Sequence, residues 1–279
     1  MTFNKRYSNL LETNGTRLCV GLDTDLAWIP DHLQAESNPI LAFNKAIIEA
    51  TSDLCSAYKM NLAFYESAGM KGMEALQGTL EAIPEHIITI GDAKRGDIGN
   101  TADHYAQAMF EFWGFDGLTV NPYMGTDTLE TYFRYEGKCI FVLALTSNPG
   151  SAQFQRITTD GKPLYVNVID RCLEEFGVRD QLGFVVGATH PNKLGKVRSR
   201  VGPNIPLLIP GVGTQGGDAG GTVKANDGGV AFVNVSRGIS KAGSGEDFVQ
   251  KAREATLDFV AQLAKEDPDA RVRMAEAAL

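Results

Sequence analysis

The stretch HIITIGDAKRGDIGN (86–100) joins an apolar run to a dense group of charges. Its first half is nearly continuous in apolar residues rather than alternating, which is typical of a parallel strand that is covered on both faces. Its second half places Asp92, Lys94, Arg95 and Asp97 within six residues. Such a cluster at the end of a strand can be a solvated turn, a metal site or a centre that moves protons.

Seven further apolar runs of the same kind occur along the chain, with amphipathic segments between them. Strands that alternate with helices predict βα units and a parallel sheet. Eight such units in 279 residues favour a closed (β/α)8 TIM barrel over an open doubly wound sheet. We expect one domain over 1–279, with an extra N-terminal helix at 3–14. The predicted strands are 18–23, 57–65, 86–94, 117–123, 138–147, 182–189, 205–212 and 230–239, and the clearest predicted helices are 39–54, 101–114, 165–177 and 245–265.

The composition narrows the class of function. Hydrophobic residues make up 43% of the chain, and the formal net charge is −8, so a general nucleic-acid binder is not expected. An anionic small molecule is still allowed, because a local group of cations can override the global charge. The four cysteines are widely spaced and form no C-x-x-C, which indicates reduced, buried thiols. Neither a signal sequence nor a membrane span is evident, so we expect a cytoplasmic protein.

The barrel makes a positional prediction, because chemistry in this fold belongs at the carboxyl ends of the strands. Polar residues from separate parts of the chain fall at these ends. A single polar residue at one strand end would mean little, whereas a convergent set indicates a site. The set is Asp23, Asp25, Lys59, Asp92, Lys94, Asn121, Ser147, Gln215 and Arg237.

The charged cluster admits three interpretations. Residues two apart on a strand face the same side, so Asp92 and Lys94 should both point into the barrel mouth. Lys59 lies in the middle of an apolar run, where an unpaired ammonium would be unfavourable, and its expected partner is Asp92. The group can therefore be a buried ion-pair network between two strands. A Mg²⁺ site is also open, although interleaved lysines would repel the metal. The third possibility is acid/base chemistry, in which a lysine flanked by carboxylates stays protonated and donates a proton.

The sequence resembles the orotidine 5'-phosphate decarboxylase family over nearly its whole length. The segment IGDAKRGDIGNTA (90–102) is similar to the family signature, in which Asp-x-Lys-x-x-Asp-Ile is followed by Gly or Pro and then Thr. The Asp-x-Lys-x-x-Asp core alone is shared with related sugar-phosphate enzymes, so the other motifs carry the specificity. Those motifs resemble the branch with longer, bacterial-type chains, and they occur in the expected order: YKMNLAFYES (58–67), TSNPGS (146–151), PGVGTQGGD (210–218) and NVSRG (234–238).

The resemblance implies a reaction and a set of roles. Family members convert orotidine 5'-monophosphate to UMP and CO₂ without a metal or an organic cofactor, in homodimers whose active sites lie at the interface. Lys59, Asp92, Lys94 and Asp97 match the family's charged tetrad. Lys94 would donate the proton, Asp92 would lie beside the substrate carboxylate, and Asp97 would come from the partner subunit. In the matching substrate-binding positions stand Asp23, Thr101, Ser147, Gln215, Arg237, Gly213 and Gly238.

Simpler explanations remain open for several of these residues. The glycine-rich segment 211–221 can be merely flexible, Arg237 can be a surface residue, and Ser147 can be a helix N-cap before Pro149. His104 is expected on the polar face of a helix, and His190 at a helix entry. The loop 148–162 is long for a βα connection and is a candidate lid.

Three other functions compete with the decarboxylase. The glycines also spell G-x-G-x-x-G at 211–216, but the following strand ends without the acidic residue of a dinucleotide site, which disfavours that reading. A Mg²⁺-dependent sugar-phosphate decarboxylase or hexulose phosphate synthase would share Asp-x-Lys-x-x-Asp and carry an acidic residue in place of Lys59. A non-catalytic nucleotide-binding barrel would bind UMP without releasing CO₂.

Overall fold

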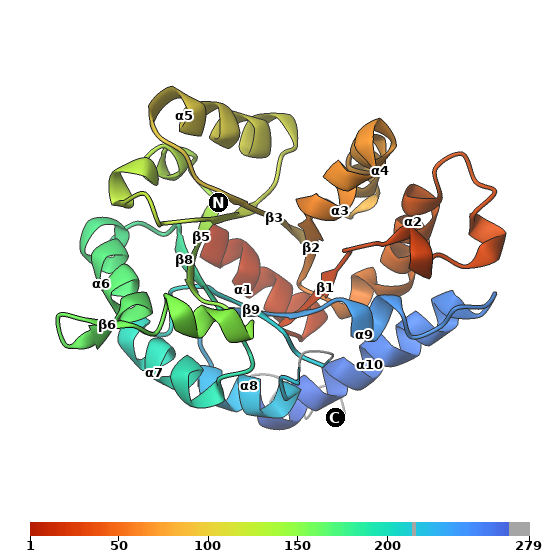
Figure 1. Ribbon diagram of the computed structural model, residues 1–279. Helices are drawn as coiled ribbons and strands as arrows, with labels where there is room; N and C mark the ends of the chain where they lie inside the picture. Colours follow the sequence, from red (N-terminus) through yellow and green to blue (C-terminus); the bar gives the residue numbers. More distant parts are fainter. Residues whose placement is uncertain (214–215, 268–279) are drawn as a thin grey trace.

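The computed structural model describes residues 1–213 and 216–267 and contains a closed barrel of eight parallel strands (Figure 1). The strand order around the barrel is β1-β10-β9-β8-β5-β4-β3-β2, which closes without a free edge. The predicted (β/α)8 TIM barrel is therefore confirmed, and each predicted run contains one barrel strand. The strands are β1 (Leu18–Gly21), β2 (Ala57–Asn61), β3 (Ile88–Arg95), β4 (Gly117–Val120), β5 (Cys139–Leu145), β8 (Leu182–Val186), β9 (Leu207–Pro210) and β10 (Ala231–Val235).

Helices surround the barrel, and the predicted ones are present with small changes at their ends (Figure 1). The segment predicted at 101–114 begins earlier and changes character: α5 ends at Gln107, and a π-helical turn continues over Ala108–Phe112. The candidate lid, 148–162, contains the turn Pro149–Gln153 and leads into a two-stranded antiparallel ribbon of β6 (Thr158–Thr159) and β7 (Lys162–Pro163). The helices are α1 (Phe3–Asn14), α2 (Pro39–Thr51), α3 (Leu62–Ser67), α4 (Gly69–Ala82), α5 (Gly99–Gln107), α6 (Leu164–Phe176), α7 (Pro191–Val201), α8 (Ala219–Asn226), α9 (Arg237–Ser240) and α10 (Phe248–Glu266).

The extra N-terminal helix α1 closes the amino end of the barrel. Thr2 caps its start by accepting from the Lys5 amide, and Gly15 ends it in the left-handed conformation that a glycine adopts without strain. The ring of Phe3 on α1 packs edge-on against Phe141 of β5, at 6.2 Å between centroids. With this end filled, the opposite, carboxyl end is left for a site.

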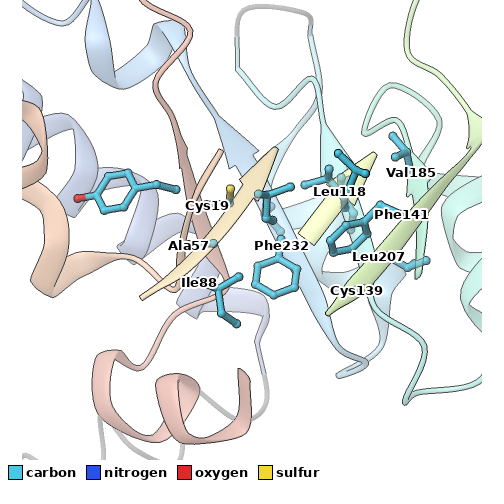
Figure 2. Close-up of a cluster of buried hydrophobic side chains, with 14 of the residues drawn as sticks. Cys19, Ala57, Ile88, Leu118, Cys139, Phe141, Val185, Leu207 and Phe232 are labelled. Atoms are coloured by element: carbon cyan, nitrogen blue, oxygen red, sulfur yellow. The ribbon is translucent and has the colours of Figure 1, made fainter. Parts of the chain in front are cut away.

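Aromatic and aliphatic side chains fill the barrel interior. Phe141 of β5 and Phe232 of β10 meet edge-to-face with centroids 5.9 Å apart, and both are fully buried (Figure 2). This geometry is favourable for aromatic pairs. The four cysteines are free and buried, as the sequence predicted. No helix in the described part of the chain is long and apolar enough to cross a membrane.

Candidate active site

A cavity of about 490 Å³ opens at the carboxyl ends of the barrel strands. Aliphatic side chains of the upper barrel form its floor, and charged and polar side chains form its wall. Seven of the residues predicted from the sequence line it: Asp23, Asp25, Lys59, Asp92, Lys94, Ser147 and Arg237. Parts of the chain more than 200 residues apart thus meet where the barrel predicts a site.

Lys59 is the buried centre of the charged group, with only 3% of its side chain exposed. Its Nζ donates to Asp23 Oδ1 at 3.0 Å and Oδ2 at 3.3 Å, and to Asp92 Oδ2 at 3.4 Å. The predicted pairing with Asp92 is confirmed, but Asp23 is the nearer partner. Burial lowers the pKa of Lys59, and the two carboxylates outweigh this effect, so its pKa lies above the ordinary value. Lys59 is therefore a fixed positive charge at neutral pH.

Asp92 connects the two lysines. Its Oδ2 accepts from Lys59, whereas its Oδ1 accepts from Lys94 Nζ at 2.7 Å and from Thr119 Oγ1 at 2.9 Å. Burial raises the pKa of Asp92, but Lys59, Lys94 and the hydrogen bonds outweigh burial and bring it to about 2. The carboxylate is thus charged over the whole physiological range, and both of its oxygens are already bound by cations.

The backbone that carries Lys94 is irregular. Four steps along β3, from Gly91 to Arg95, match only two along β4, from Leu118 to Val120, so β3 bulges at the site. Within the bulge Lys94 has φ +49°, a left-handed conformation that side-chain-bearing residues rarely adopt. Its amide donates to Thr119 Oγ1 at 3.0 Å. Bulges and strained residues of this kind often re-aim a side chain at a functional site.

Ser147 and Arg237 come later in the chain than this bulge and line the same cavity. Arg237 is the first residue of α9, directly after β10, and it is an exposed residue that lines the cavity. Ser147 also lines the cavity and does not cap a helix, since Asn148 holds the position before the turn Pro149–Gln153. The N-cap explanation for Ser147 is therefore wrong, whereas Arg237 is both an exposed residue and part of the cavity lining.

The glycine segment is only partly in the cavity. Gly211 lines it, but Gly213 does not, and Gln215 lies outside the described residues. The amides of Gly213 and Gly217 donate to carbonyls within the loop itself, at 3.0 and 3.1 Å. Gly238 is also outside the cavity lining, and its lack of a side chain has a packing reason: a Cβ there would lie 3.0 Å from the Phe259 ring.

Asp97 and Thr101 are not brought to this cavity within the described chain. Asp97 follows β3, and its carboxylate accepts from the Ile98 amide at 2.8 Å. Thr101 lies exposed on the first turn of α5. The two histidines behave as the sequence predicted: His104 is exposed on α5, and His190 precedes α7 at its N-cap position.

Three contributors were missed in the sequence. Thr119 looked like an ordinary residue of an apolar strand, yet it fixes both Asp92 and Lys94. Asn61 ends β2 in the cavity wall, and its amide donates to Asp23 Oδ1 at 3.0 Å. Trp28 also lines the cavity, with Lys241 Nζ 4.7 Å from the centre of its ring. Asn61 follows Lys59 by two residues, so the alternation of strand side chains could have found it.

Size alone would not select this cavity. A groove of about 820 Å³ lies at the amino end of the barrel, and one of about 900 Å³ lies between α6, α7 and α8. Neither contains an alternating array of buried charges. Among the described residues, no cluster of three or more His, Cys, Asp and Glu side chains is arranged to hold a metal ion.

The fold and the cavity define a class: a (β/α)8 barrel with a lysine–carboxylate centre and an arginine after its last strand. A family model described as "Orotidine 5'-phosphate decarboxylase / HUMPS family" matches residues 16–255. The chain belongs to this family.

Individual proteins agree with that assignment. Orotidine 5'-phosphate decarboxylase of Herpetosiphon aurantiacus is 43% identical over 259 residues, which cover 92% of this chain and 96% of that protein. The Bacteroides fragilis protein of the same name is 46% identical over 256 residues, with 89% and 92% covered. The solved OMP decarboxylase of Leishmania donovani aligns with a TM-score of 0.78 at 34% identity and covers 94% of this chain and 100% of its own.

Proposed function

We propose that this protein decarboxylates orotidine 5'-monophosphate to UMP and CO₂ in de novo pyrimidine synthesis. The observation that carries the proposal is the alternating array of Lys59, Asp92 and Lys94 at one wall of a cavity that also contains Arg237. Family membership and the names of the relatives support the same reaction.

The reaction needs a stabilised negative charge, because loss of CO₂ leaves a carbanion-like centre at C6 of the pyrimidine. The ammonium of Lys94 is the proposed proton donor to that carbon, and a fixed cation stabilises charge as it develops there. Asp92 holds this ammonium at 2.7 Å, and Lys59 and Thr119 hold Asp92. The array is therefore organised before the substrate arrives, and no metal or organic cofactor is needed for these steps.

Asp92 contributes a second effect. The substrate carboxylate is expected beside it, and two like charges about 4 Å apart repel by roughly 4 kcal/mol at an effective dielectric of about 20. This repulsion disappears when CO₂ leaves, and a free energy of that size corresponds to about a thousandfold in rate. The pKa of about 2 keeps Asp92 charged, as this role requires.

Binding is proposed to come from the opposite part of the cavity. Arg237 can grip the phosphate with two parallel hydrogen bonds. Gly238 follows it in the first turn of α9, where backbone N–H groups have no partner within the helix. Ser147 is proposed to contact the pyrimidine. Asp23 is proposed to serve the ribose hydroxyls in addition to holding Lys59.

The remaining binding residues are proposed for the phosphate loop and a lid. Gly213 and Gln215 belong to the glycine segment at the usual phosphate position of barrels, between strands seven and eight. The loop 148–162 stands next to Ser147, and its closure over the substrate would exclude water from the charged array. Closure driven by phosphate binding would use that binding energy for the chemical step.

We propose a homodimer in which Asp97 and Thr101 of each subunit contribute to the active site of the other. Neither residue lines the cavity of its own chain, although Asp97 comes only three residues after Lys94. Exposed apolar side chains surround this segment: Ile98 is 64% and Tyr123 is 86% exposed. A second copy that covers them would bury this apolar surface and bring Asp97 to the neighbouring cavity. We further propose a single domain over 1–279 and a cytoplasmic location, in which the free buried cysteines stay reduced.

A spectrophotometric assay of orotidine 5'-monophosphate loss tests the reaction directly. We expect turnover by the purified protein and none by Lys94→Ala, which should keep most of its affinity for UMP. Well-folded wild-type protein without turnover would refute the proposal, and UMP binding in that case would favour the non-catalytic barrel. Mixing inactive Lys94→Ala with inactive Asp97→Ala chains should restore some activity, and verified mixed dimers without activity would contradict the shared site.

The Mg²⁺-dependent enzymes of the same family group are the second candidate. They require an acidic residue where this chain has Lys59, and here both oxygens of Asp92 already accept from ammonium or hydroxyl groups. This donor set is unsuited to a divalent cation. Turnover should therefore be unchanged by EDTA, and activity that is lost with EDTA and restored by Mg²⁺ would favour the second candidate.

A further inference from the structure

Arg95 stands in the middle of the charged signature but does not line the cavity. Its side chain contacts two other elements, and its backbone carbonyl a third. One Nη pairs with Glu66 of α3, and the guanidinium lies over the ring of Tyr105 on α5, with Cζ 5.2 Å from the ring centre. Its carbonyl accepts from the Asn121 amide at 2.8 Å, beyond the end of β4. A single residue thus ties the end of β3 to three neighbouring segments.

The burial around Arg95 makes its position specific. Within the described residues, Arg95 Nε and Tyr132 Oη are both buried without a hydrogen-bond partner. Tyr132 is fully buried and interacts electrostatically with Arg95, Tyr105 and Asp97. Buried polar groups are normally satisfied, so this packing holds the guanidinium in place at the expense of a hydrogen bond.

Lys94, whose backbone conformation has to be held in place, is the residue before Arg95. Lys94 has a left-handed backbone, and such a conformation persists only when its surroundings over-determine it. On its amino side, Thr119 holds Asp92 and the Lys94 amide. On its carboxyl side, the next anchor in the chain is Arg95. Rotation about the backbone between these anchors would carry the Lys94 ammonium away from Asp92.

We propose that Arg95 and Glu66 form a positioning pair that holds the strained backbone of Lys94, and with it the aim of the proton donor. This inference rests on the proposed function. It predicts that loss of the pair slows the chemical step and leaves substrate binding nearly unchanged, because neither residue touches the cavity. A misplacement of about 1 Å can slow catalysis by about 100-fold, so we expect a fall in kcat of roughly 10- to 100-fold.

The test uses Arg95→Met and Glu66→Ala, with Glu66→Gln as the conservative variant. Both truncations should lower kcat for orotidine 5'-monophosphate, with KM and the Kd of UMP within about threefold of wild type. Glu66→Gln keeps an oxygen that can accept from the guanidinium and should recover most of kcat. The double variant should be no slower than the slower single variant, because both changes break one contact.

Arg179 and Glu130 provide a matched control. They form a similar half-exposed pair, with N–O distances of 3.0 and 3.1 Å, and Arg179 also lies over an aromatic ring, 5.4 Å from the centre of Phe176. They have no contact with the charged segment in the described chain, so Arg179→Met and Glu130→Ala should keep wild-type kcat. The inference is wrong if Arg95→Met and Glu66→Ala turn over as fast as these controls, or if UMP affinity falls as much as kcat. If Arg95→Met does not fold, Glu66→Ala and Glu66→Gln decide. Absence of turnover in the wild type would instead refute the proposed function.

Discussion

Replacement of Lys59 by methionine should lower the stability of the protein, because it unbalances the charges of the array. Methionine has a similar length and keeps the apolar part of the contact, but it removes the positive charge between Asp23 and Asp92. Their oxygens lie 3.0 and 3.4 Å from Nζ on two different carboxylates. Without the ammonium, two negative charges face each other in a site that is largely closed to water.

The size of the effect follows from these distances. Two unit charges at a separation of roughly 6 Å and an effective dielectric of about 20 repel by roughly 3 kcal/mol. Removing one member of a buried ion pair destabilises a protein by about 3–5 kcal/mol, which is the same range. Removal of Lys59 also raises the pKa of Asp92 above its wild-type value, because burial and the facing carboxylate are no longer opposed by that ammonium.

Because of the raised pKa, the stability of Lys59→Met should depend on pH. Asp92 in folded Lys59→Met binds a proton more readily than in the folded wild type, so the stability deficit of the variant becomes smaller as pH falls from neutral. Urea unfolding should therefore show a deficit of about 3 kcal/mol or more at pH 7.5 that becomes smaller at pH 5. Activity should be lost at both pH values, because Asp92 no longer has its fixed position.

The control for this experiment is Lys71→Met. Lys71 is 67% exposed and pairs with Glu74 one turn away on α4, so its removal should change the free energy of unfolding by less than about 1 kcal/mol at either pH. The reasoning would be refuted if Lys59→Met were as stable as this control at pH 7.5. A deficit that is identical at pH 7.5 and pH 5 would show that lost packing, not charge repulsion, is the cause.

Three further predictions concern single residues. The pKa of Asp92 lies below its value in the unfolded chain, so this carboxylate should add about 2 kcal/mol to the free energy of unfolding above pH 4. The contribution is lost as pH falls toward 2. Unfolding measured over this pH range should show the loss in wild type and not in Asp92→Asn. Asp267→Ala removes the carboxylate that accepts from the fully buried Arg17 at 2.7 Å, so chemical unfolding should show a loss of about 3–5 kcal/mol. Asp53→Ala, in an exposed pair, should lose less than about 1 kcal/mol. Thr119→Val removes two hydrogen bonds at the bulge and should lower kcat by about tenfold or more with KM little changed. An unchanged kcat in steady-state kinetics would show that Thr119 does not support the site.

The fold could be predicted because its signal is local and repeated. Each strand of a two-sided parallel sheet needs a nearly continuous apolar run, and eight such runs separated by helices leave few alternatives. The N-terminal helix was also predictable, since Thr2 and Gly15 mark its ends by well-known capping chemistry. The change to a π-helical turn after Gln107 has no comparable signal and was missed.

The site was predictable only where its residues are unusual for their surroundings. A lysine such as Lys59 in an apolar run needs a partner, and that requirement pointed to Asp92 correctly. That Asp23 lies closer depends on the pairing of β1 with β2, in which Gly21 faces Lys59, and this register is set by the closed barrel. Thr119 could not be recognised, because threonine is common in strands for reasons unrelated to function. The left-handed Lys94 depends on the mismatch between β3 and β4, which exists only after the two strands pair.

The charge balance among Asp23, Lys59, Asp92 and Lys94 explains why the site can be stable and still favour the reaction. Two ammonium groups, Lys59 and Lys94, face two carboxylates, Asp23 and Asp92, so this group is neutral and each of its four charges has a partner. Neutrality is what makes it tolerable that Lys59, Asp23 and Asp92 are largely buried beside the half-exposed Lys94. In the proposed reaction the substrate adds one more carboxylate on this side, while Arg237 receives the phosphate on the other. Departure of CO₂ leaves the negative charge of the substrate carboxylate on the pyrimidine carbon, and a proton from the Lys94 ammonium neutralises it there. Lys94 is then neutral until a proton from solvent restores its charge. The stability of the resting site and its bias toward decarboxylation thus follow from the same arrangement of charges.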